Sequence, residues 1–553
     1  MTERLHLVLA QLNQTVGDLT GNAENILRAR RAHKDADLLI CPELCVSGYP
    51  PEDLSLRPAY VAACEDRLEE LAKATGDEPG PWVVVGTPMA GEADGDPRPY
   101  NVAALIGDGK VQGIARKVCL PNYGPFDEPR TFRPASTVDV IPFRGVKLGL
   151  MVCEDMWFPE VARDLKKAGA DVLIVPHGSP FRRTVHEERL EQAKARTLET
   201  GLPLAFVNQC GGQDELIFDG GCFVVQDGEV AASAPLFEEH SLPLDLTKSD
   251  RGWRTEEAPV TAWPTEDALI YQALVTGTRD YIRKSGFNDV VIGLSGGVDS
   301  ALVAAIAVDA LGPEHVHCVR LPSRYTSEGS MVDAEACAKA LGVRLDTVEI
   351  EPAVGAFDGM LEGIFGGRAP DVTEENLQSR IRGTALMAIS NKLGSMMLTT
   401  GNKSEMACGY ATLYGDMNGG FNPLKDVYKT RVFSLCRWRN SAKPDAALGP
   451  DGVVIPEVII TKPPSAELRE DQKDEDSLPP YDILDDILHG LIEEELSVPA
   501  IAARGHDIAL VRRVQAMLYR AEYKRKQSAP GPKVSRRYFG RDRRYPIVNR
   551  FKE

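Results

Sequence analysis

The sequence predicts an α/β protein made of two layered domains in series, and three observations support this. The chain has 553 residues, which exceeds the roughly 100–200 residues of one ordinary domain. Short apolar runs alternate with helix-like segments over residues 1–230, and the same alternation begins again near Ala268. Strands and helices in rotation are typical of sheets covered by helices.

The first domain is expected to span residues 1–250. Its apolar runs have the length of buried strands. They are Leu5–Ala10, Asp37–Cys41, Trp82–Gly86, Leu148–Cys153, Asp171–Pro176 and Leu204–Asn208. Helical patterns lie between them, among them Asn22–Lys34 and Pro159–Ala168. From Ser233 to Asp267 the alternation gives way to Pro, Trp and charged residues, which predicts a linker, placed at residues 251–267.

The second domain is expected to span residues 268–553. It opens with a helix through Lys284, a strand at Asp289–Leu294, a glycine-rich turn and a helix that ends at Leu311. Further strands are expected at Val316–Leu321 and Arg344–Ile350. Residues 440–480 are rich in Pro and charge, so we expect a mobile loop there rather than core.

Composition excludes several functional classes. The 63 Lys and Arg against 81 Asp and Glu give a net charge of −18, and an acidic field repels nucleic acids and anionic membranes. The 11 cysteines have no regular spacing, which favours a reducing compartment over a disulfide framework. The first residues carry too short an apolar run for a signal peptide, and no apolar stretch is long enough to span a membrane. We therefore expect a soluble, cytoplasmic protein.

The C-terminal segment Lys524–Glu553 has the opposite charge balance. It holds eleven Lys or Arg residues and two acidic residues. A solvated tail or an intersubunit contact would explain this composition. A phosphate-binding arm would explain it equally well, so the segment alone leaves the choice open.

Three segments of the first domain carry candidate catalytic residues. They read CPELCVSGYP from Cys41, RKVCLPNYGPF from Arg116 and LMVCEDMW from Leu150. Each follows a strand-like run, where α/β folds place active-site residues. A nucleophilic cysteine needs a base for the thiol proton and a cation for the resulting anion. Cys153, Glu43 and Lys117 could fill these roles, although a lone Cys at a strand end is most often a core residue.

These segments resemble the nitrilase superfamily, whose members cleave carbon–nitrogen bonds with a Glu–Lys–Cys triad. The resemblance covers about residues 4–230. The segments SPF, from Ser179, and NQCGGQDELIFDG, from Asn208, are similar to the glutamine-hydrolysing branch of that superfamily. The resemblance therefore implies an αββα sandwich domain that hydrolyses glutamine.

The same resemblance assigns roles to individual residues. It implies Glu43 as general base, Lys117 as stabiliser of the oxyanion, and Cys153 as the nucleophile that forms a thioester. The glutamine-binding positions that it implies are Tyr49, Tyr123, Phe126, Glu154, Ser179 and Val185.

Val185 departs from the pattern of the family, which has Lys or Arg six residues after the serine of SPF. A valine cannot donate a charge-assisted hydrogen bond to the α-carboxylate of glutamine. Either Arg182 or Arg183 supplies this contact, or glutamine binds weakly and free ammonia matters more. We favour an arginine because the triad is intact.

The second domain carries a glycine-rich turn between a strand and a helix, VVIGLSGGVDSA from Val290 to Ala301. Backbone N–H groups and the helix dipole at such a turn can hold phosphate. The turn lacks the Lys of a Walker A loop and the spacing GxGxxG, so neither a P-loop NTPase nor a Rossmann dinucleotide site fits. A tight turn that simply requires glycine is the alternative.

The segment SGGVDS, Ser295–Ser300, resembles the pyrophosphate loop of ATP pyrophosphatases. These enzymes split ATP into AMP and pyrophosphate while they adenylate a substrate oxygen. The resemblance implies a Rossmann-like doubly wound domain and Mg²⁺ bound by Asp299, since Mg²⁺ prefers carboxylate oxygens. The ATP-binding residues that it implies are Gly293, Leu294, Ser295, Gly296, Gly297, Val298, Asp299 and Ser300.

Downstream segments resemble the NAD synthetases within that superfamily. They are NLQSRIRG from Asn376, LTTGNKSEMACGYATLYGDMNGGFN from Leu398, PLKDVYKTRV from Pro423 and KPPSAELREDQKDEDSLPPYD from Lys462. By this resemblance Thr400 and Lys429 contact ATP. Glu405 binds both metal and deamido-NAD, and Asn376 and Lys524 also bind deamido-NAD.

The whole chain resembles bacterial glutamine-dependent NAD synthetases. The implied ligase reaction is the ATP-dependent amidation of nicotinic acid adenine dinucleotide (deamido-NAD) to NAD. It proceeds through an adenylated intermediate, releases AMP and pyrophosphate, and uses ammonia from L-glutamine. The implied partners are L-glutamine, ATP, deamido-NAD and Mg²⁺, with no nucleic acid or membrane, and the family implies a homo-oligomer.

Two other interpretations compete with this one. Another glutamine-fed ATP pyrophosphatase could amidate a nucleobase or modify tRNA. The segments NLQSRIRG and TLYGDM favour the dinucleotide enzyme, and no RNA-binding module is visible. A non-catalytic scaffold would not need the intact triad or the SGGVDS loop.

Overall fold

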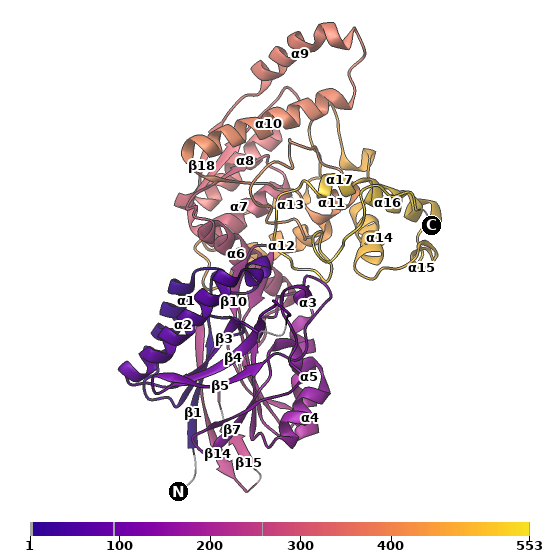
Figure 1. Ribbon diagram of the computed structural model, residues 1–553. Helices are drawn as coiled ribbons and strands as arrows, with labels where there is room; N and C mark the ends of the chain where they lie inside the picture. Colours follow the sequence, from indigo (N-terminus) through magenta and orange to yellow (C-terminus); the bar gives the residue numbers. More distant parts are fainter. Residues whose placement is uncertain (1–3, 92–94, 251, 257, 552) are drawn as a thin grey trace. The chain divides into compact units, whose positions relative to one another are not determined.

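The computed structural model describes residues 4–91, 95–250, 252–256, 258–551 and 553. The chain divides into two compact units, Met1–Trp263 and Pro264–Glu553 (Figure 1). Each unit has its own sheets and its own hydrophobic core. We describe them separately as unit 1 and unit 2.

Unit 1 contains two large sheets. The seven-stranded sheet has the order β15-β14-β1-β2-β3-β4-β5, and the six-stranded sheet has the order β13-β12-β9-β8-β7-β6. The strands of the first are β1 (Arg4–Gln11), β2 (Leu38–Ile40), β3 (Trp82–Met89), β4 (Tyr100–Gly107), β5 (Lys110–Arg116), β14 (His240–Ser249) and β15 (Gly252–Thr255). Those of the second are β6 (Val140–Phe143), β7 (Val146–Leu150), β8 (Val172–His177), β9 (Leu204–Asn208), β12 (Phe223–Gln226) and β13 (Glu229–Ser233). A separate hairpin pairs β10 (Cys210–Gln213) with β11 (Leu216–Asp219).

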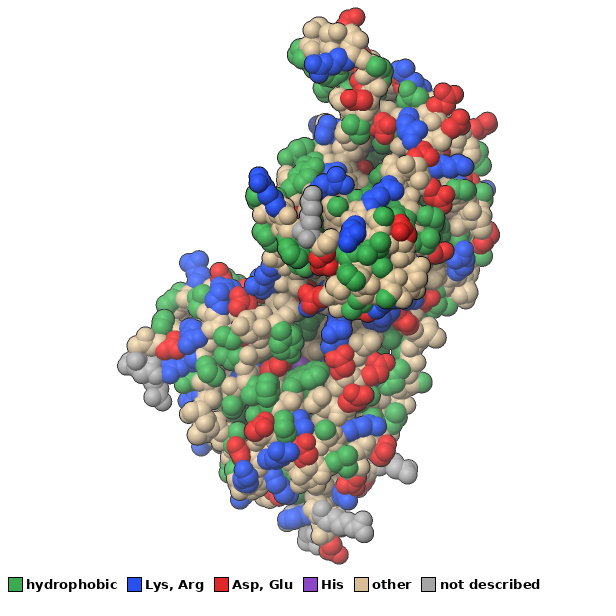
Figure 2. Space-filling model, turned by 90° about the vertical axis from the view of Figure 1, so that its right-hand side faces the viewer, with side chains coloured by type: hydrophobic (Ala, Val, Ile, Leu, Met, Phe, Trp, Pro, Cys, Tyr) green, Lys and Arg blue, Asp and Glu red, His purple; other side chains and the backbone are tan. Residues whose placement is uncertain are grey.

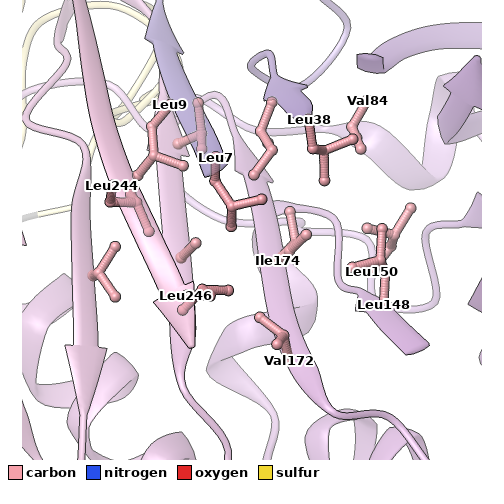
Figure 3. Packing of buried hydrophobic residues seen from close by; sticks show 14 of the residues in the cluster. Leu7, Leu9, Leu38, Val84, Leu148, Leu150, Val172, Ile174, Leu244 and Leu246 are labelled. Carbon is pink, nitrogen blue, oxygen red and sulfur yellow. The ribbon is translucent and has the colours of Figure 1, made fainter. Parts of the chain in front are cut away.

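The two sheets share one core. Leu7 and Leu38 from the first sheet pack in the same cluster as Leu150 and Ile174 from the second (Figure 3). Alternate side chains of a strand point to opposite faces, so the remaining apolar residues of these strands point outward to the helices. Val8, for example, belongs to the cluster that also holds residues of α1 and α2.

Helices cover both outer faces of this sandwich. Helices α1 (Leu19–Ala32) and α2 (Pro58–Asp77) pack on the seven-stranded sheet, and α4 (Pro159–Lys167) and α5 (Val185–Thr200) pack on the six-stranded sheet (Figure 1). The short helix α3 (Glu128–Thr131) and the 3₁₀ helices η1 (Glu52–Leu56) and η2 (Cys153–Trp157) lie in loops. The predicted αββα sandwich is confirmed.

Part of the predicted linker belongs to unit 1. Residues Gly252–Thr255 form β15, an antiparallel partner of β14, and Trp253 is buried. β1 pairs along its whole length with β14. The Pro and charged residues between Ser233 and Asp267 misled the prediction. β15 is the edge strand of the sheet, and the pairing described for it covers only Leu246–Ser249 of β14, so the part of β14 that holds Pro243 lies outside that pairing and tolerates a proline.

Unit 2 is built on a four-stranded parallel sheet. Its order is β18-β17-β16-β19, with β16 (Val290–Gly293), β17 (Val316–Arg320), β18 (Arg344–Thr347) and β19 (Met396–Leu398). The chain moves outward from β16 to β18 and then returns to place β19 on the other side of β16. In doubly wound sheets ligands bind at such a reversal, beyond the carboxyl ends of the strands. The predicted Rossmann-like class is confirmed.

Helices cover the sheet of unit 2 and form a second cluster beyond it. They are α6 (Glu266–Lys284), α7 (Val298–Leu311), α8 (Glu328–Leu341), α9 (Glu351–Phe365), α10 (Val372–Leu393), α11 (Lys403–Cys408), α12 (Lys429–Ser441), α13 (Glu457–Thr461), α14 (Tyr481–Ile492), α15 (Val498–Ala502), α16 (Ile508–Arg520) and α17 (Glu522–Arg525), with the 3₁₀ helices η3 (Pro313–His315) and η4 (Asp474–Asp476). Leu386 of α10 packs on β16, β17 and β19. Helices α11, α14, α15 and α16 share a separate apolar cluster with Phe539.

One expectation for unit 2 needs correction, and the structure bears on one choice that the sequence left open. Residues 440–480 are not outside the core: Val454, Ile455 and Ile459 are buried, because apolar residues are interspersed among the prolines. The basic C-terminal segment is not simply a solvated tail, since the buried carboxylate of Asp426 accepts hydrogen bonds from the backbone of Val534 and Ser535.

The surface carries both acidic and basic side chains, as the composition predicts. On the face shown in Figure 2, acidic and basic side chains are interspersed rather than gathered in one positive band. Among the described residues, no helix has the length and apolar character that crossing a membrane would need.

Candidate active sites

The structure of unit 1 brings Glu43, Lys117 and Cys153 together. Glu43 follows β2, Lys117 follows β5 and Cys153 follows β7, so three strand ends supply the group. The Nζ atom of Lys117 lies 2.8 Å from Oε1 of Glu43, and both side chains are fully buried. The sulfur of Cys153 lies within 4.8 Å of the Glu43 carboxylate.

Backbone geometry and Asp155 set the position of Cys153. Cys153 has a left-handed φ of 52° and begins η2, so the predicted tight turn is present, although β7 ends three residues earlier, at Leu150. The buried carboxylate of Asp155 accepts hydrogen bonds from the backbone N–H groups of Val152 (2.9 Å), Val118 (3.0 Å) and Cys119 (2.7 Å). It therefore ties the cysteine turn to the segment that carries Lys117.

Burial governs the electrostatics of this site. Burial raises the pKa of the Cys153 thiol well above its ordinary value, and the Glu43 carboxylate adds to the effect. Burial opposes the charge on Lys117, but Cys153, Glu128 and Glu43 outweigh it and raise the pKa of Lys117. A raised pKa favours the thiol form of Cys153, and a thiol needs a base before it can attack.

Sequence reasoning missed two residues that hold the triad. The amide of Asn101 donates to Oε1 of Glu43 at 2.7 Å. Glu128, on α3, accepts from Lys117 at 3.0 Å and from the hydroxyl of Tyr49 at 3.1 Å. Burial raises the pKa of Glu128 to about 7. Glu128 lies two residues past the RKVCLPNYGPF segment, but a single acid in a Pro-rich loop gives no distinctive sequence signal.

The aromatic residues predicted to bind glutamine lie beside the triad. The hydroxyl of Tyr123 donates to Glu154 at 2.9 Å, and the ring of Phe126 meets that of Tyr123 edge-on at 5.7 Å. Tyr123 is 54% exposed, whereas Tyr49 is buried against Glu128. A side chain at Gly178 would meet both Glu43 and Tyr49, so the chain passes tightly here.

Ser179 is held by a buried arginine that sequence reasoning did not single out. Nε of Arg189 donates to the hydroxyl oxygen of Ser179 at 3.0 Å. The same guanidinium donates to both carboxylate oxygens of Asp219, at 2.8 and 2.9 Å, and both side chains are 1% exposed. Asn208 donates to the backbone carbonyl of Ser179 at 3.2 Å. The network fixes the SPF turn.

The structure bears on which residue could replace the Lys or Arg that the family usually has at position 185. Val185 is buried at the start of α5 and offers no polar side-chain atom. Arg182 donates to Thr184 at 3.0 Å and forms a two-pronged ion pair with Glu188. Arg182 would have to leave Glu188 to reach a substrate carboxylate, and Arg183 is the other arginine of this turn.

In unit 2, the SGGVDS loop connects β16 to α7 at the reversal of the sheet. Gly296 has a left-handed φ of 80°, and a Cβ there would lie 2.3 Å from the backbone oxygen of Ser330, so only glycine fits. The hydroxyls of Ser295 and Ser300 lie 3.1 Å apart and hold the loop closed. The loop therefore requires Gly296 for its geometry, and it also leads into the N-terminus of a 14-residue helix.

The loop lines a cavity of about 550 Å³. Seven of the predicted loop residues lie on its wall: Gly293, Leu294, Ser295, Gly297, Val298, Asp299 and Ser300. Thr400, which follows β19, lies on the same wall with Lys429 and Glu405. The residues predicted to bind ATP are therefore brought together at the switch point.

Acidic side chains surround one ammonium group in this cavity. Lys429, the first residue of α12, forms an ion pair with Asp299 and lies 3.8 Å from Glu405. Burial raises the pKa of Glu405 well above its ordinary value, and the charge of Asp299 adds to it. Asp474 lines the same cavity. These carboxylates outnumber the lysine, which is the environment a divalent cation neutralises.

Only one of the three residues predicted to bind deamido-NAD lies on the cavity wall. Glu405 lies on its wall, but Asn376 and Lys524 do not. Asn376 accepts a hydrogen bond from Thr412 at 2.9 Å, and Lys524 donates to the carbonyl oxygens of Gly409 and Ala411 at 2.7 and 2.6 Å. Both residues therefore hold the segment 409–412, whose residue Ala411 does line the cavity.

One cationic wall residue was quoted in a motif but not assigned. Arg382, within NLQSRIRG, donates to the backbone oxygen of Leu321 at 2.9 Å and to Ser323 at 3.2 Å. It lines the cavity, and burial lowers its pKa to about 10. The structure therefore places a guanidinium on the cavity wall from a segment that the sequence analysis quoted without assigning a role to this arginine.

Comparison with known proteins agrees with both sites. The family model described as carbon-nitrogen hydrolase matches residues 7–251, and the one described as NAD synthase matches residues 270–528. The fold and the two sites therefore define a two-domain amidotransferase, in which a carbon–nitrogen hydrolase precedes a synthase.

Full-length relatives identify the family. The chain is 51% identical to the glutamine-dependent NAD(+) synthetase of Rhodobacter capsulatus and 47% identical to that of Xylella fastidiosa strain Temecula1, with all of each chain covered. The solved glutamine-dependent NAD+ synthetase of Acinetobacter baumannii, in complex with ADP, is 41% identical with a TM-score of 0.78, over 99% of both chains. The chain belongs to the family of glutamine-dependent NAD(+) synthetases.

Proposed function

We propose that this chain makes NAD from deamido-NAD, with ATP as the energy source and the amide of L-glutamine as the nitrogen source. The glutaminase activity is assigned to residues 1–250 and the synthetase activity to residues 268–553. The observation that carries the proposal is the cavity at the switch point, where the SGGVDS loop, Thr400 and Lys429 meet, in a chain that also holds the buried triad.

The first step is glutamine hydrolysis in unit 1. Glu43 takes the thiol proton of Cys153 as the sulfur attacks the amide carbon, and Lys117 stabilises the resulting oxyanion. The carbon–nitrogen bond then breaks, and ammonia leaves with the proton that Glu43 returns. Water cleaves the thioester, which releases glutamate and restores the thiol. The contacts of Glu43 with Lys117 and Asn101 support this assignment because they fix the carboxylate beside the sulfur.

The second step is activation of deamido-NAD in unit 2. A carboxylate oxygen of the nicotinate attacks the α-phosphorus of ATP, the bond to the β-phosphate breaks, and pyrophosphate leaves. Ammonia then attacks the carbonyl carbon, AMP departs with the bonding electrons, and the nitrogen releases one proton to solvent. The SGGVDS loop, at the N-terminus of α7, and the ammonium of Lys429 would bind the departing anion; their presence on one cavity wall supports this assignment.

Mg²⁺ fits the carboxylates of this cavity. Asp299 and Glu405 would hold it, since both carboxyl groups approach Lys429 and a bound cation would favour the ionised form of Glu405. When bound, the ion would neutralise charge on the phosphates of ATP. Asn376 and Lys524 are proposed to support the deamido-NAD site by holding segment 409–412.

The proposal is tested by one incubation with ATP, Mg²⁺, L-glutamine and deamido-NAD, in which NAD, AMP and glutamate are quantified together. We expect NAD and AMP in equal amounts, and none without deamido-NAD. Formation of AMP with a nucleobase or tRNA instead of deamido-NAD would favour the competing pyrophosphatase function.

A further inference from the structure

Beside the triad lies a buried histidine that the glutaminase chemistry does not use. His177 is the last residue of β8 and is 2% exposed. Within the described part of the chain, neither of its ring nitrogens has a hydrogen-bond partner. A buried polar group without a hydrogen-bond partner lowers the stability of the folded protein, so the ring nitrogens of His177 are candidates for binding a ligand.

His177 completes a cluster with two triad residues. One ring nitrogen of His177, the sulfur of Cys153 and a carboxylate oxygen of Glu43 all lie within 4.8 Å of one another. Oε1 of Glu43 is occupied by Lys117 and Asn101, while Oε2 has no hydrogen-bond partner among the described residues. The cluster therefore offers one thiol, one imidazole and one unsatisfied carboxylate oxygen.

We propose that Glu43, Cys153 and His177 form a binding site for a zinc-class divalent cation, which reversibly blocks glutamine hydrolysis. Thiolate, imidazole and carboxylate are the ligand types of Zn²⁺, and three protein ligands with one open position are typical of accessible zinc sites. A tetrahedral Zn²⁺ holds its ligand atoms roughly 3.3–3.6 Å apart, so the side chains would close in by roughly 1–1.5 Å at most.

Charge and protons balance in this site. Binding replaces the proton of the Cys153 thiol with the metal, and that proton leaves to solvent. His177 is available as a neutral ligand, because burial lowers the pKa of its imidazole well below the ordinary value. Lys117 opposes a cation nearby, but Glu128 shares that ammonium at 2.8 Å and offsets part of its charge.

The same ligands explain selectivity against Mg²⁺. Mg²⁺ prefers six oxygen ligands, and this cluster offers one carboxylate with a softer thiolate and imidazole. The metal would occupy the sulfur that attacks glutamine and the carboxylate that takes its proton. The inhibition rests on the proposed function of Cys153, whereas metal binding does not.

Cobalt provides a readout that is independent of activity. The full chain, freed of metal with a chelator and desalted, is titrated with Co²⁺ alone, and near-ultraviolet absorption reports thiolate-to-cobalt charge transfer. We expect this band in the wild type and in Cys64→Ala, a control at another buried cysteine, and its loss in Cys153→Ala. His177→Asn and His177→Gln should weaken Co²⁺ binding more than about tenfold, since even the loss of a group behind a ligand costs about 10–100-fold.

Inhibition is then measured as glutamate release without ATP, so that unit 2 takes no part. Each variant is titrated with Zn²⁺, and its rate of glutamate release is divided by the rate of the same variant without metal. We expect the half-inhibitory Zn²⁺ concentration to rise more than about tenfold in both His177 variants and to stay unchanged in His33→Asn. Absence of the cobalt band in the wild type, or an unaltered band in both His177 variants, would overturn the site. A normal band without zinc inhibition would support the site and contradict the proposed role of Cys153.

Discussion

Lys117 and Glu43 form an ion pair with 2.8 Å between Nζ and Oε1, and both side chains are fully buried. A buried pair of this kind is poor evidence for stability, because removing two charges from water costs about as much as their attraction returns. Removing one partner alone typically costs about 3–5 kcal/mol. We attribute the pair to catalysis, because it holds a base and a cation next to each other and close to the thiol of Cys153.

Asp299→Ala should abolish synthesis with either nitrogen donor. The carboxylate of Asp299 pairs with Lys429 on the wall of the synthetase cavity, and its loss removes a proposed Mg²⁺ ligand. We expect NAD formation from glutamine or ammonium to fall about a hundredfold or more, the scale seen when one group that stabilises transition-state charge is removed. Glutamate release without ATP should persist.

The matched control for this variant is Asp445→Ala, at an exposed position outside the cavity. NAD is quantified for both variants with each donor. Wild-type synthesis from ammonium by Asp299→Ala would refute the assignment of the pyrophosphate loop.

Glu128 should make the stability of the protein depend on pH. Burial raises the pKa of this carboxyl from 4.5 to about 7 in the folded state. Between these values the folded state binds more protons than the unfolded state, so the free energy of unfolding falls as pH rises. Relative to Glu128→Gln, the wild type should therefore lose stability steadily from about pH 5 to about pH 8.

This difference is measured by urea unfolding of the wild type and of Glu128→Gln at four pH values. Glu69→Gln, an exposed carboxyl on α2, serves as control and should show no such trend. A difference between wild type and Glu128→Gln that is flat across this range would contradict the raised pKa.

Arg189→Met should destabilise unit 1 and lower its affinity for glutamine. The guanidinium pairs with Asp219 in the core and holds the hydroxyl of Ser179. Removing it strands a buried carboxylate, so we expect a loss of about 3–5 kcal/mol in the free energy of unfolding. The double variant Arg189→Met/Asp219→Leu should recover much of this stability but not the Michaelis constant for glutamine, because Ser179 still lacks its partner. If the double variant recovered both its stability and the wild-type Michaelis constant for glutamine, Arg189 would have only a structural role.

The buried position of Val185 leaves the charge for the α-carboxylate of glutamine to a neighbour. Arg182 is held by Glu188 in a half-buried ion pair, and pairs that remain open to water contribute only about 0–1 kcal/mol, so Arg182 can be recruited at small cost. We expect Arg182→Ala or Arg183→Ala to raise the Michaelis constant for glutamine about ten- to a hundredfold, the value of one charged hydrogen bond. If neither does so and Val185→Lys lowers it, glutamine binding is weak in this chain and the preference for an arginine is wrong.

The sequence correctly predicted the strands that are marked by a local run of apolar residues. The apolar runs at Leu204–Asn208 and Val316–Leu321 correspond to β9 and β17 within one residue, because a buried strand is apolar along its whole length. β14 and β15 were missed. β14 is a strand because it pairs with β1, more than 200 residues away, and β15 is a strand because it pairs with β14, although the segment is locally rich in charge.

The site residues also differ in whether the local sequence identifies them. Glu43, Lys117 and Cys153 stand in distinctive segments, and the structure brings them together. His177 and Arg189 gave no signal, since their importance comes from the strands and helices that converge on them in three dimensions.

The path of the glutamine nitrogen tests the central claim most directly. The wild type is incubated with ATP, Mg²⁺, deamido-NAD and glutamine labelled with ¹⁵N in its amide, with unlabelled ammonium added, and the NAD is analysed by mass spectrometry. Cys153→Ala is treated in the same way. We expect labelled NAD from the wild type, and from Cys153→Ala only unlabelled NAD made from the added ammonium, because the synthetase site lies in unit 2. Unlabelled NAD from the wild type, or labelled NAD from Cys153→Ala, would contradict the assignment of Cys153 as the source of ammonia for NAD synthesis.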